Sequence, residues 1–120
     1  EAFDINPNNQ LSKWDKIELN HVKVKQGFIY VLSNQLMPGV YKIGFTSRNP
    51  DERAKEISIK VNLPSSFKVE RYWRSDDPYI VEQRIHEELK PYFRAGEFFE
   101  GDLQLFYQVV TKHIDNVNKS

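Results

Sequence analysis

Five polar side chains have spacings that could bring them to one surface, and together they suit an anionic substrate. Tyr30 supplies a phenol and Lys42 an ammonium, each in a segment of strand-like alternation. Arg53 supplies a guanidinium at the start of a helical segment, whereas Glu82 and His86 stand one turn apart on a later helix. An arginine fork and the amino end of a helix both bind phosphate. The set therefore indicates a substrate that carries phosphate.

Residues 27–46 predict a β-hairpin that would carry two of these side chains. FIYVLS is rich in β-branched and aromatic residues, and Pro38-Gly39 supplies a turn before VYKIGF. Parity predicts one apolar face, made of Ile29, Val31, Tyr41, Ile43 and Phe45. The opposite face carries Tyr30 and Lys42, and a register that places them directly across from each other would make them cross-strand neighbours.

A helix and a third strand follow the hairpin. Asn49-Pro50-Asp51-Glu52 has the N-cap, the first-position proline and the acidic first turn of a helix over about 50–59. Residues 67–74 alternate along the chain as a strand does, which predicts a third strand in the same sheet.

Two more helices complete the expected order. Asp76-Asp77-Pro78 caps a longer helix, whose apolar stripe at spacings of four, four and three is Val81, Ile85, Leu89 and Tyr92. A short apolar piece at 97–99 precedes a last helix that begins at Leu103. The order ββαβα(β)α predicts an α/β or α+β fold, a small sheet covered by helices, over residues 27–120. Residues 1–26 are interpreted as an extension or linker with a short helix around 11–19.

Composition excludes several classes of protein. The chain has 120 residues, of which 39% are hydrophobic and 28% charged, which is typical of one globular core. Its longest apolar runs are too short to cross a bilayer. The absence of cysteine excludes a disulfide scaffold and fits the cytoplasm. Lys plus Arg and Asp plus Glu number 17 each, so any contact with nucleic acid must be local.

Four segments in order resemble the GIY-YIG nuclease superfamily. They are Gly27-Phe28-Ile29-Tyr30, Tyr41-Lys42-Ile43-Gly44, Arg53 and a helical Glu82. KIGFTSRNPDER, VEQRIHEEL and GEFFEG further resemble a phage and bacterial branch in which lysine replaces the second tyrosine. The resemblance covers about residues 27–102, whereas dinucleotide, P-loop, G-x-S-x-G and H-E-x-x-H motifs are absent.

The resemblance implies a three-stranded antiparallel sheet flanked by helices and a metal-dependent endonuclease. Tyr30 would be the general base or would orient water, Lys42 would lower its pKa, and Arg53 would hold the scissile phosphate. Glu82 would be the one protein ligand of Mg²⁺ or Mn²⁺, which is often held by one or two carboxylates. His86 is a further catalytic candidate, although a structural histidine is the alternative.

Three other residues are expected to contact the substrate. Arg48 joins Arg53 in a local basic patch, and Arg94 and Glu97 are stand-ins for an asparagine that many relatives carry in that region. DNA rather than RNA is the expected partner, without a membrane. Other domains of a longer parent protein, or a second copy of the chain, are further candidate partners. The alternative function is a catalytically silent nucleic-acid-binding or protein-interaction domain on the same fold.

Overall fold

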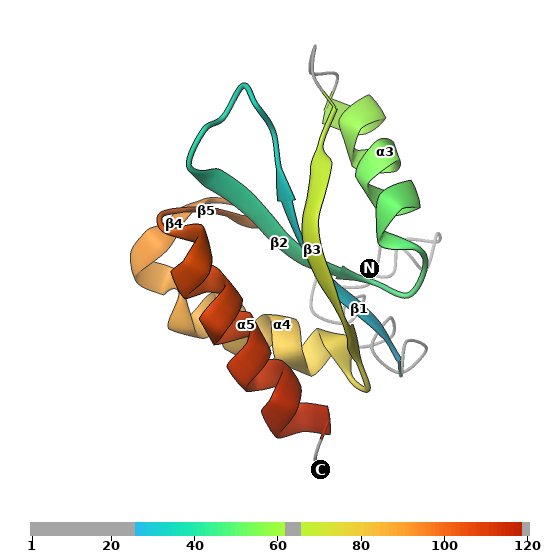
Figure 1. Cartoon of the computed structure of the whole chain (residues 1–120), viewed down its shortest axis with the longest axis vertical. Helices are drawn as coiled ribbons and strands as arrows, with labels where there is room; N and C mark the ends of the chain where they lie inside the picture. The colour runs from blue at the N-terminus through green and yellow to red at the C-terminus, as the bar shows by residue number, and fades with distance from the viewer. Residues whose placement is uncertain (1–25, 62–65, 119–120) are drawn as a thin grey trace, which may run out of the picture.

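A computed structural model describes residues 26–61 and 66–118. It consists of a five-stranded sheet with helices on both faces (Figure 1). Helices α4 (Pro78–Glu88) and α5 (Leu103–Asn118) cover one face, and α3 (Pro50–Val61) covers the other. The α+β class predicted from the order of elements is therefore confirmed.

The sheet has two more strands than the resemblance implied. Its antiparallel order is β3–β1–β2–β5–β4, with the bounds β1 Gly27–Ser33, β2 Val40–Thr46, β3 Lys68–Ser75, β4 Phe93–Ala95 and β5 Phe98–Glu100. The last two strands have three residues each, too few for a period of two to be recognised in the sequence. The prediction of three strands was therefore wrong in number.

The hairpin register differs from the one considered above. Tyr30 pairs with Gly44, and Lys42 pairs with Leu32. Two consecutive turns lengthen the connection, because the Asn34 carbonyl accepts from the Met37 amide at 2.8 Å and the Met37 carbonyl accepts from the Val40 amide at 3.1 Å. A shift of two residues preserves the face of every side chain, so Tyr30 and Lys42 still share one face.

The long helix ends earlier than its apolar stripe. Asp77 caps α4, and its side chain accepts a hydrogen bond from the Ile80 amide at 3.3 Å. After Glu88 the chain forms a 3-10 turn, η1 (Lys90–Tyr92), in place of further α-helix. Pro91 explains the change, because proline lacks the amide proton and disfavours the α conformation in the residue before it.

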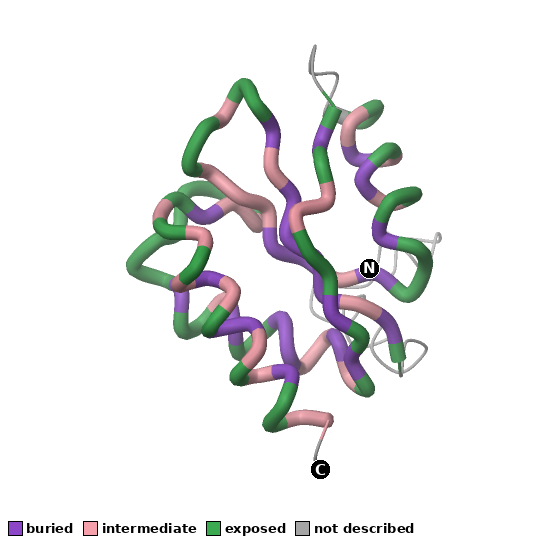
Figure 2. Tube along the Cα trace, viewed as in Figure 1, coloured by how far each residue is buried: buried purple, intermediate pink, exposed green. Residues whose placement is uncertain are grey.

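Two apolar cores lie on opposite faces of the sheet. The larger one joins the faces of α4 and α5 to Ile29, Val31 and Ile43, as strand parity predicts. The smaller one joins Ala54 and Ile57 of α3 to the other face of β1. Figure 2 shows buried and exposed residues alternating along α3, as expected for a helix with one side on the sheet.

Part of the sequence interpretation lies outside the described residues. The helix expected around 11–19 and nearly all of the extension at 1–26 fall there. Within the described part of the chain, no helix is both long enough and apolar enough to span a membrane.

Candidate functional site

Gly44 of β2 permits two polar side chains to lie against the strand. A Cβ atom on this glycine would stand 2.7 Å from the Tyr30 hydroxyl oxygen and 2.7 Å from Oε1 of Glu97. Both distances are shorter than real Cβ contacts, so any larger residue would displace one of the two groups. Tyr30 comes from the neighbouring strand β1, whereas Glu97 lies between β4 and β5.

Lys42 and Glu97 form an ion pair beside this position. The distance from Nζ to Oε1 is 2.8 Å, and the Lys42 side chain is only 14% exposed. The same ammonium stands 5.3 Å from the centre of the Phe98 ring. An otherwise costly charge on an inner strand is thus compensated by a carboxylate and an aromatic face.

Glu82 lies buried beside Glu97. Its residue exposure is 5%, and its Oε2 atom has no hydrogen-bond partner in the described structure. Gln83 donates a long hydrogen bond of 3.4 Å to the other oxygen. Burial, followed by the negative charge of Glu97, raises the pKa of Glu82 to about 9. The Glu82 carboxyl group therefore binds a proton at neutral pH, or a cation in its place.

Arg53 brings α3 to the same place. Its guanidinium lies close enough to the Tyr30 hydroxyl to act on the pKa of this group, which is itself almost fully buried. Burial raises the pKa of Tyr30 and the charge of Glu97 raises it further, against the opposite effect of Arg53. The expectation that Lys42 lowers this pKa was wrong, because Lys42 is paired with Glu97 while Tyr30 is enclosed.

These five residues form the Glu82 cluster, which consists of Tyr30, Lys42, Arg53, Glu82 and Glu97. The sequence singled out all five, and the structure brings them together from β1, β2, α3, α4 and the turn before β5. Gly44 was quoted as part of a motif but was given no role. Only its position opposite Tyr30, set by the register, explains why a glycine is needed there.

Glu56 of α3 forms ion pairs with Arg48 and Arg53, the two arginines of the predicted basic patch. Both guanidinium nitrogens of Arg48 lie against Glu56, at 2.8 and 2.7 Å, on the exposed surface. Arg53 reaches the same carboxylate at 3.3 Å. The hydrogen bond from Arg48 is the main cause that lowers the pKa of Glu56. Arg48 is thus linked to the Glu82 cluster through Glu56 and Arg53.

His86 forms a hydrogen bond to the backbone of β2. Its Nε2 atom is 2.8 Å from the Ile43 carbonyl oxygen and must donate, because a carbonyl only accepts. Its ring packs on Phe99 with the ring centres 5.0 Å apart. Burial lowers the pKa of His86, so the ring is neutral at pH 7. These contacts indicate that His86 stabilises the packing of α4 against β2 and β5, beside the cluster.

Arg94 has a different partner from the other predicted residues. It forms an ion pair with Glu100 across the β4–β5 ladder, and both side chains are exposed. This pair lies on the side of a shallow pocket lined also by Leu36, Met37 and Pro38. Of the two stand-ins, Glu97 therefore reaches the Glu82 cluster while Arg94 pairs with a neighbouring strand.

The cluster fits a magnesium-like ion better than a transition metal. Among the described residues no three His, Cys, Asp or Glu side chains are grouped so that they could hold a metal by themselves. Glu82 and Glu97 nevertheless supply adjacent carboxylates, one of which has an unpartnered oxygen. Mg²⁺ keeps several waters and is often bound by one or two carboxylates together with substrate phosphate. The donor set suits such an ion.

The geometry thus defines a small α+β domain in which two carboxylates, two cations and a tyrosine gather around the buried Glu82. The family model that matches is that of the T5orf172 domain, over residues 27–117. The chain therefore belongs to the T5orf172 domain family.

A relative gives a second comparison. The chain is 28% identical over 105 residues to a protein of Invertebrate iridescent virus 6 described as KilA-N domain-containing. The match covers 85% of this chain but 44% of the viral protein, so the chain spans less than half the length of that relative. No solved structure matches the chain significantly.

These findings correct two predictions. The resemblance to the GIY-YIG nuclease superfamily was the wrong assignment, because the matching family model is that of the T5orf172 domain. The identification as a GIY-YIG endonuclease was drawn from that resemblance and is withdrawn with it. The short segments that suggested it contain residues that the structure brings together in the Glu82 cluster.

Proposed function

We propose that this domain binds DNA through its phosphate backbone at the Glu82 cluster. The observation that carries the proposal is the convergence of Arg53 and Lys42 with a buried, unpartnered Glu82 oxygen at one edge of the sheet. The two cations supply donors for phosphate oxygens. Membership of the T5orf172 family and the likeness to a KilA-N domain-containing protein favour DNA binding over the other alternative, a protein-interaction domain.

A divalent cation, Mg²⁺ or Mn²⁺, belongs to this proposal. Without it, Glu82 keeps its proton at neutral pH and offers no charge to a ligand, and an ionised Glu82 would join Glu97 in repelling a phosphate that approached Arg53. With the ion held by Glu82 and Glu97, the local charge becomes positive, and the ion's free positions are available to phosphate oxygens. DNA binding at this site should therefore require a divalent cation at neutral pH.

Fluorescence anisotropy with labelled DNA tests the proposal directly. Titrations in Mg²⁺, in Ca²⁺ and in EDTA should give binding in the first two and little in the third, and denaturing gels show that the DNA stays full-length. Arg53→Ala should weaken binding by roughly 10- to 150-fold, from about 1.5–3 kcal/mol for a hydrogen bond to a charged group.

A matched arginine provides the control. The Arg74 side chain, on the edge strand β3, is 56% exposed, and it binds Asp76 at 2.8 Å. Arg74→Ala makes the same change of charge and should leave the affinity within about twofold, a range typical of uncoupled surface changes. Equal losses in both variants, or equal binding in EDTA, would refute the cluster as the DNA site.

A further inference from the structure

A cavity of about 550 Å³ lies next to the Glu82 cluster, between α4 and the β4–β5 hairpin. Two of its lining residues adjoin the cluster in the chain: Gln83 follows Glu82, and Gly96 precedes Glu97. Gln83 also contacts Glu82 directly, at 3.4 Å. The cavity and the cluster are therefore adjacent, so a base in the cavity and a phosphate at the cluster could belong to one DNA strand.

Aromatic rings form one wall of the cavity. Phe93 packs edge-on against Phe99 with the ring centres 6.0 Å apart, and Phe99 in turn packs against His86. Phe99 is buried and His86 is fixed by its hydrogen bond to Ile43, so this wall is preorganised. Phe93 is 54% exposed despite its size, which leaves a free aromatic surface at the mouth.

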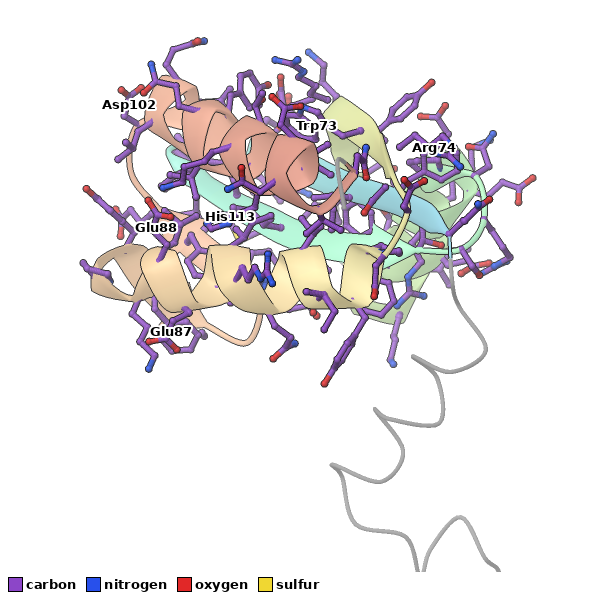
Figure 3. The ribbon with its side chains drawn as sticks, turned by 90° about the horizontal axis from the view of Figure 1, so that it is seen from below. Trp73, Arg74, Glu87, Glu88, Asp102 and His113 are labelled. Carbon is purple, nitrogen blue, oxygen red and sulfur yellow. The ribbon has the colours of Figure 1, made fainter. Side chains whose placement is uncertain are left out.

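The charges around the cavity cancel. Glu87 and Lys90 form an ion pair at 3.1 Å, and both are largely exposed. Figure 3 shows Glu87 on the side of α4 that faces away from α5, whereas Glu88 and His113 lie between the two helices. Burial lowers the pKa of His86 and keeps its ring neutral. An anionic group therefore finds no net attraction here, and a flat uncharged ligand fits better.

We propose that this cavity receives an unpaired nucleobase of the DNA strand whose phosphate is bound at the Glu82 cluster, with the base stacked on Phe93. The inference rests on the proposed function and adds the class of DNA, namely DNA with a single-stranded or extruded nucleotide. The amide of Gln83 and the ion-paired Lys90 supply hydrogen-bonding groups for the edge of a base. A base within a duplex could not reach the aromatic wall.

Four DNA ligands of equal length separate stacking from phosphate binding. They are a single strand, the matching duplex, an abasic strand, and a strand with one 2-aminopurine. Base–aromatic stacking is worth about 1–3 kcal/mol by substitution, so the wild-type domain should bind the single strand roughly 5- to 150-fold more tightly than the abasic strand. Emission from 2-aminopurine should fall on binding.

Phe93→Leu tests the wall while it preserves an apolar side chain. This variant should bind the single strand about as weakly as the abasic strand and should lose the quenching, with binding to the duplex and the abasic strand unchanged. Tyr72→Leu is the matched control, because Tyr72 is a 52% exposed aromatic residue on the opposite edge strand β3. Thermal unfolding of both variants checks that each is folded.

The outcomes distinguish this inference from the proposed function. If the wild type binds the single and abasic strands equally, or if Tyr72→Leu and not Phe93→Leu abolishes the difference, the cavity is not a base site although phosphate binding stands. If the abasic strand does not respond to Arg53→Ala, the proposed phosphate site itself fails.

Discussion

Lys42 and Glu97 are joined by an ion pair of 2.8 Å at the point where β5 begins, beyond which β2 is paired with β1 but no longer with β5. The pairing between β2 and β5 stops at Lys42. The next amide of β2, that of Ile43, donates a hydrogen bond to the Glu97 carbonyl at 3.0 Å. Backbone and side chain of Glu97 are therefore both held by β2. This double attachment places its carboxylate next to the buried Glu82.

Lys42→Met should destabilise the protein because it leaves the Glu97 carboxylate, next to buried Glu82, without its cation. Glu97 is 38% exposed, so water screens part of the loss, and a decrease of about 1–3 kcal/mol in the free energy of unfolding is expected. Urea unfolding at pH 8 measures it, and Mg²⁺ should recover part of the loss. The control is Lys112→Met, which breaks an exposed pair with Glu88 of 2.7 Å and should cost less than about 1 kcal/mol. Equal losses would show that the Lys42 pair is ordinary.

Glu82→Gln should remove a pH dependence of stability. The folded pKa of about 9 lies above the ordinary value of 4.5, so the native state binds more protons than the unfolded state between these two values. The stability contributed by the protonated group is present below pH 4.5 and is lost as the pH rises through 9, by at most about 1.4 kcal/mol per pH unit.

Urea unfolding in EDTA from pH 5 to 9 checks this sign. The wild type should lose stability across the range, and Glu82→Gln should give a flatter profile and be the more stable protein at pH 8. Added Mg²⁺ should stabilise the wild type at pH 8 but not the variant. A wild-type stability that increases from pH 6 to 9 would mean that Glu82 is ionised without a cation.

Gly44→Ala should disrupt the cluster without adding or removing a charge. The new Cβ would stand 2.7 Å from both the Tyr30 hydroxyl oxygen and Glu97 Oε1, so one of these groups must move. We expect DNA binding in Mg²⁺ to fall at least tenfold. Gly39→Ala is the control, because a Cβ at Gly39 would have no atom within 4 Å, although the φ angle there is +78°. Alanine should therefore cost about 1 kcal/mol of stability and leave DNA binding unchanged. Normal binding by Gly44→Ala would contradict the geometry.

His86→Leu should act on stability through the edge of β2. The variant leaves the Ile43 carbonyl without its side-chain donor, which costs about 1–3 kcal/mol. Because the folded pKa of His86 is lowered, its own contribution to stability should be lost as the pH falls below 6.5, so the variant should be destabilised less at pH 5 than at pH 7. Amide exchange near Ile43 and urea unfolding at pH 5 and 7 measure both effects. Unchanged exchange would refute this role.

Local chemistry explains how much of the fold the sequence predicted. The N-cap at Asp77, the helix start at Asn49 and the alternation through Ile29 and Val31 depend on neighbouring residues, and the structure has each of them. Strand β5 depends on pairing with β2 across more than fifty residues, and β4 depends on β5. Each has three residues, which carry too little pattern to reveal the pairing.

The site was predictable in composition but not in electrostatics. Residue types at Tyr30, Arg53 and Glu82 indicated phosphate chemistry, and these side chains do converge. The pKa of Tyr30 changes in the direction opposite to the expected one because burial, which no local pattern reports, outweighs the nearby cation. Likewise, the motif segments agreed with a nuclease family, while the match over residues 27–117 identified another.

Glu56→Gln should strengthen DNA binding, because Glu56 competes with phosphate for two arginines. Arg48 contacts Glu56 through both nitrogens and Arg53 reaches it at 3.3 Å, although both side chains remain partly exposed. In the wild type these ion pairs and the neutral net charge should keep the salt dependence shallow, with a slope of about −2 to −4 in log K against log salt. Glutamine removes the competing charge, so the slope should steepen by about 0.9 for each arginine that gains a phosphate contact.

Glu52→Gln is the matched control, since it makes the same change one turn earlier on α3, where no ion pair with these arginines is found. Anisotropy titrations in Mg²⁺ at several salt concentrations measure both variants. An unchanged slope in Glu56→Gln, or the same increase in Glu52→Gln, would show that the arginines do not contact DNA in the way the cluster predicts.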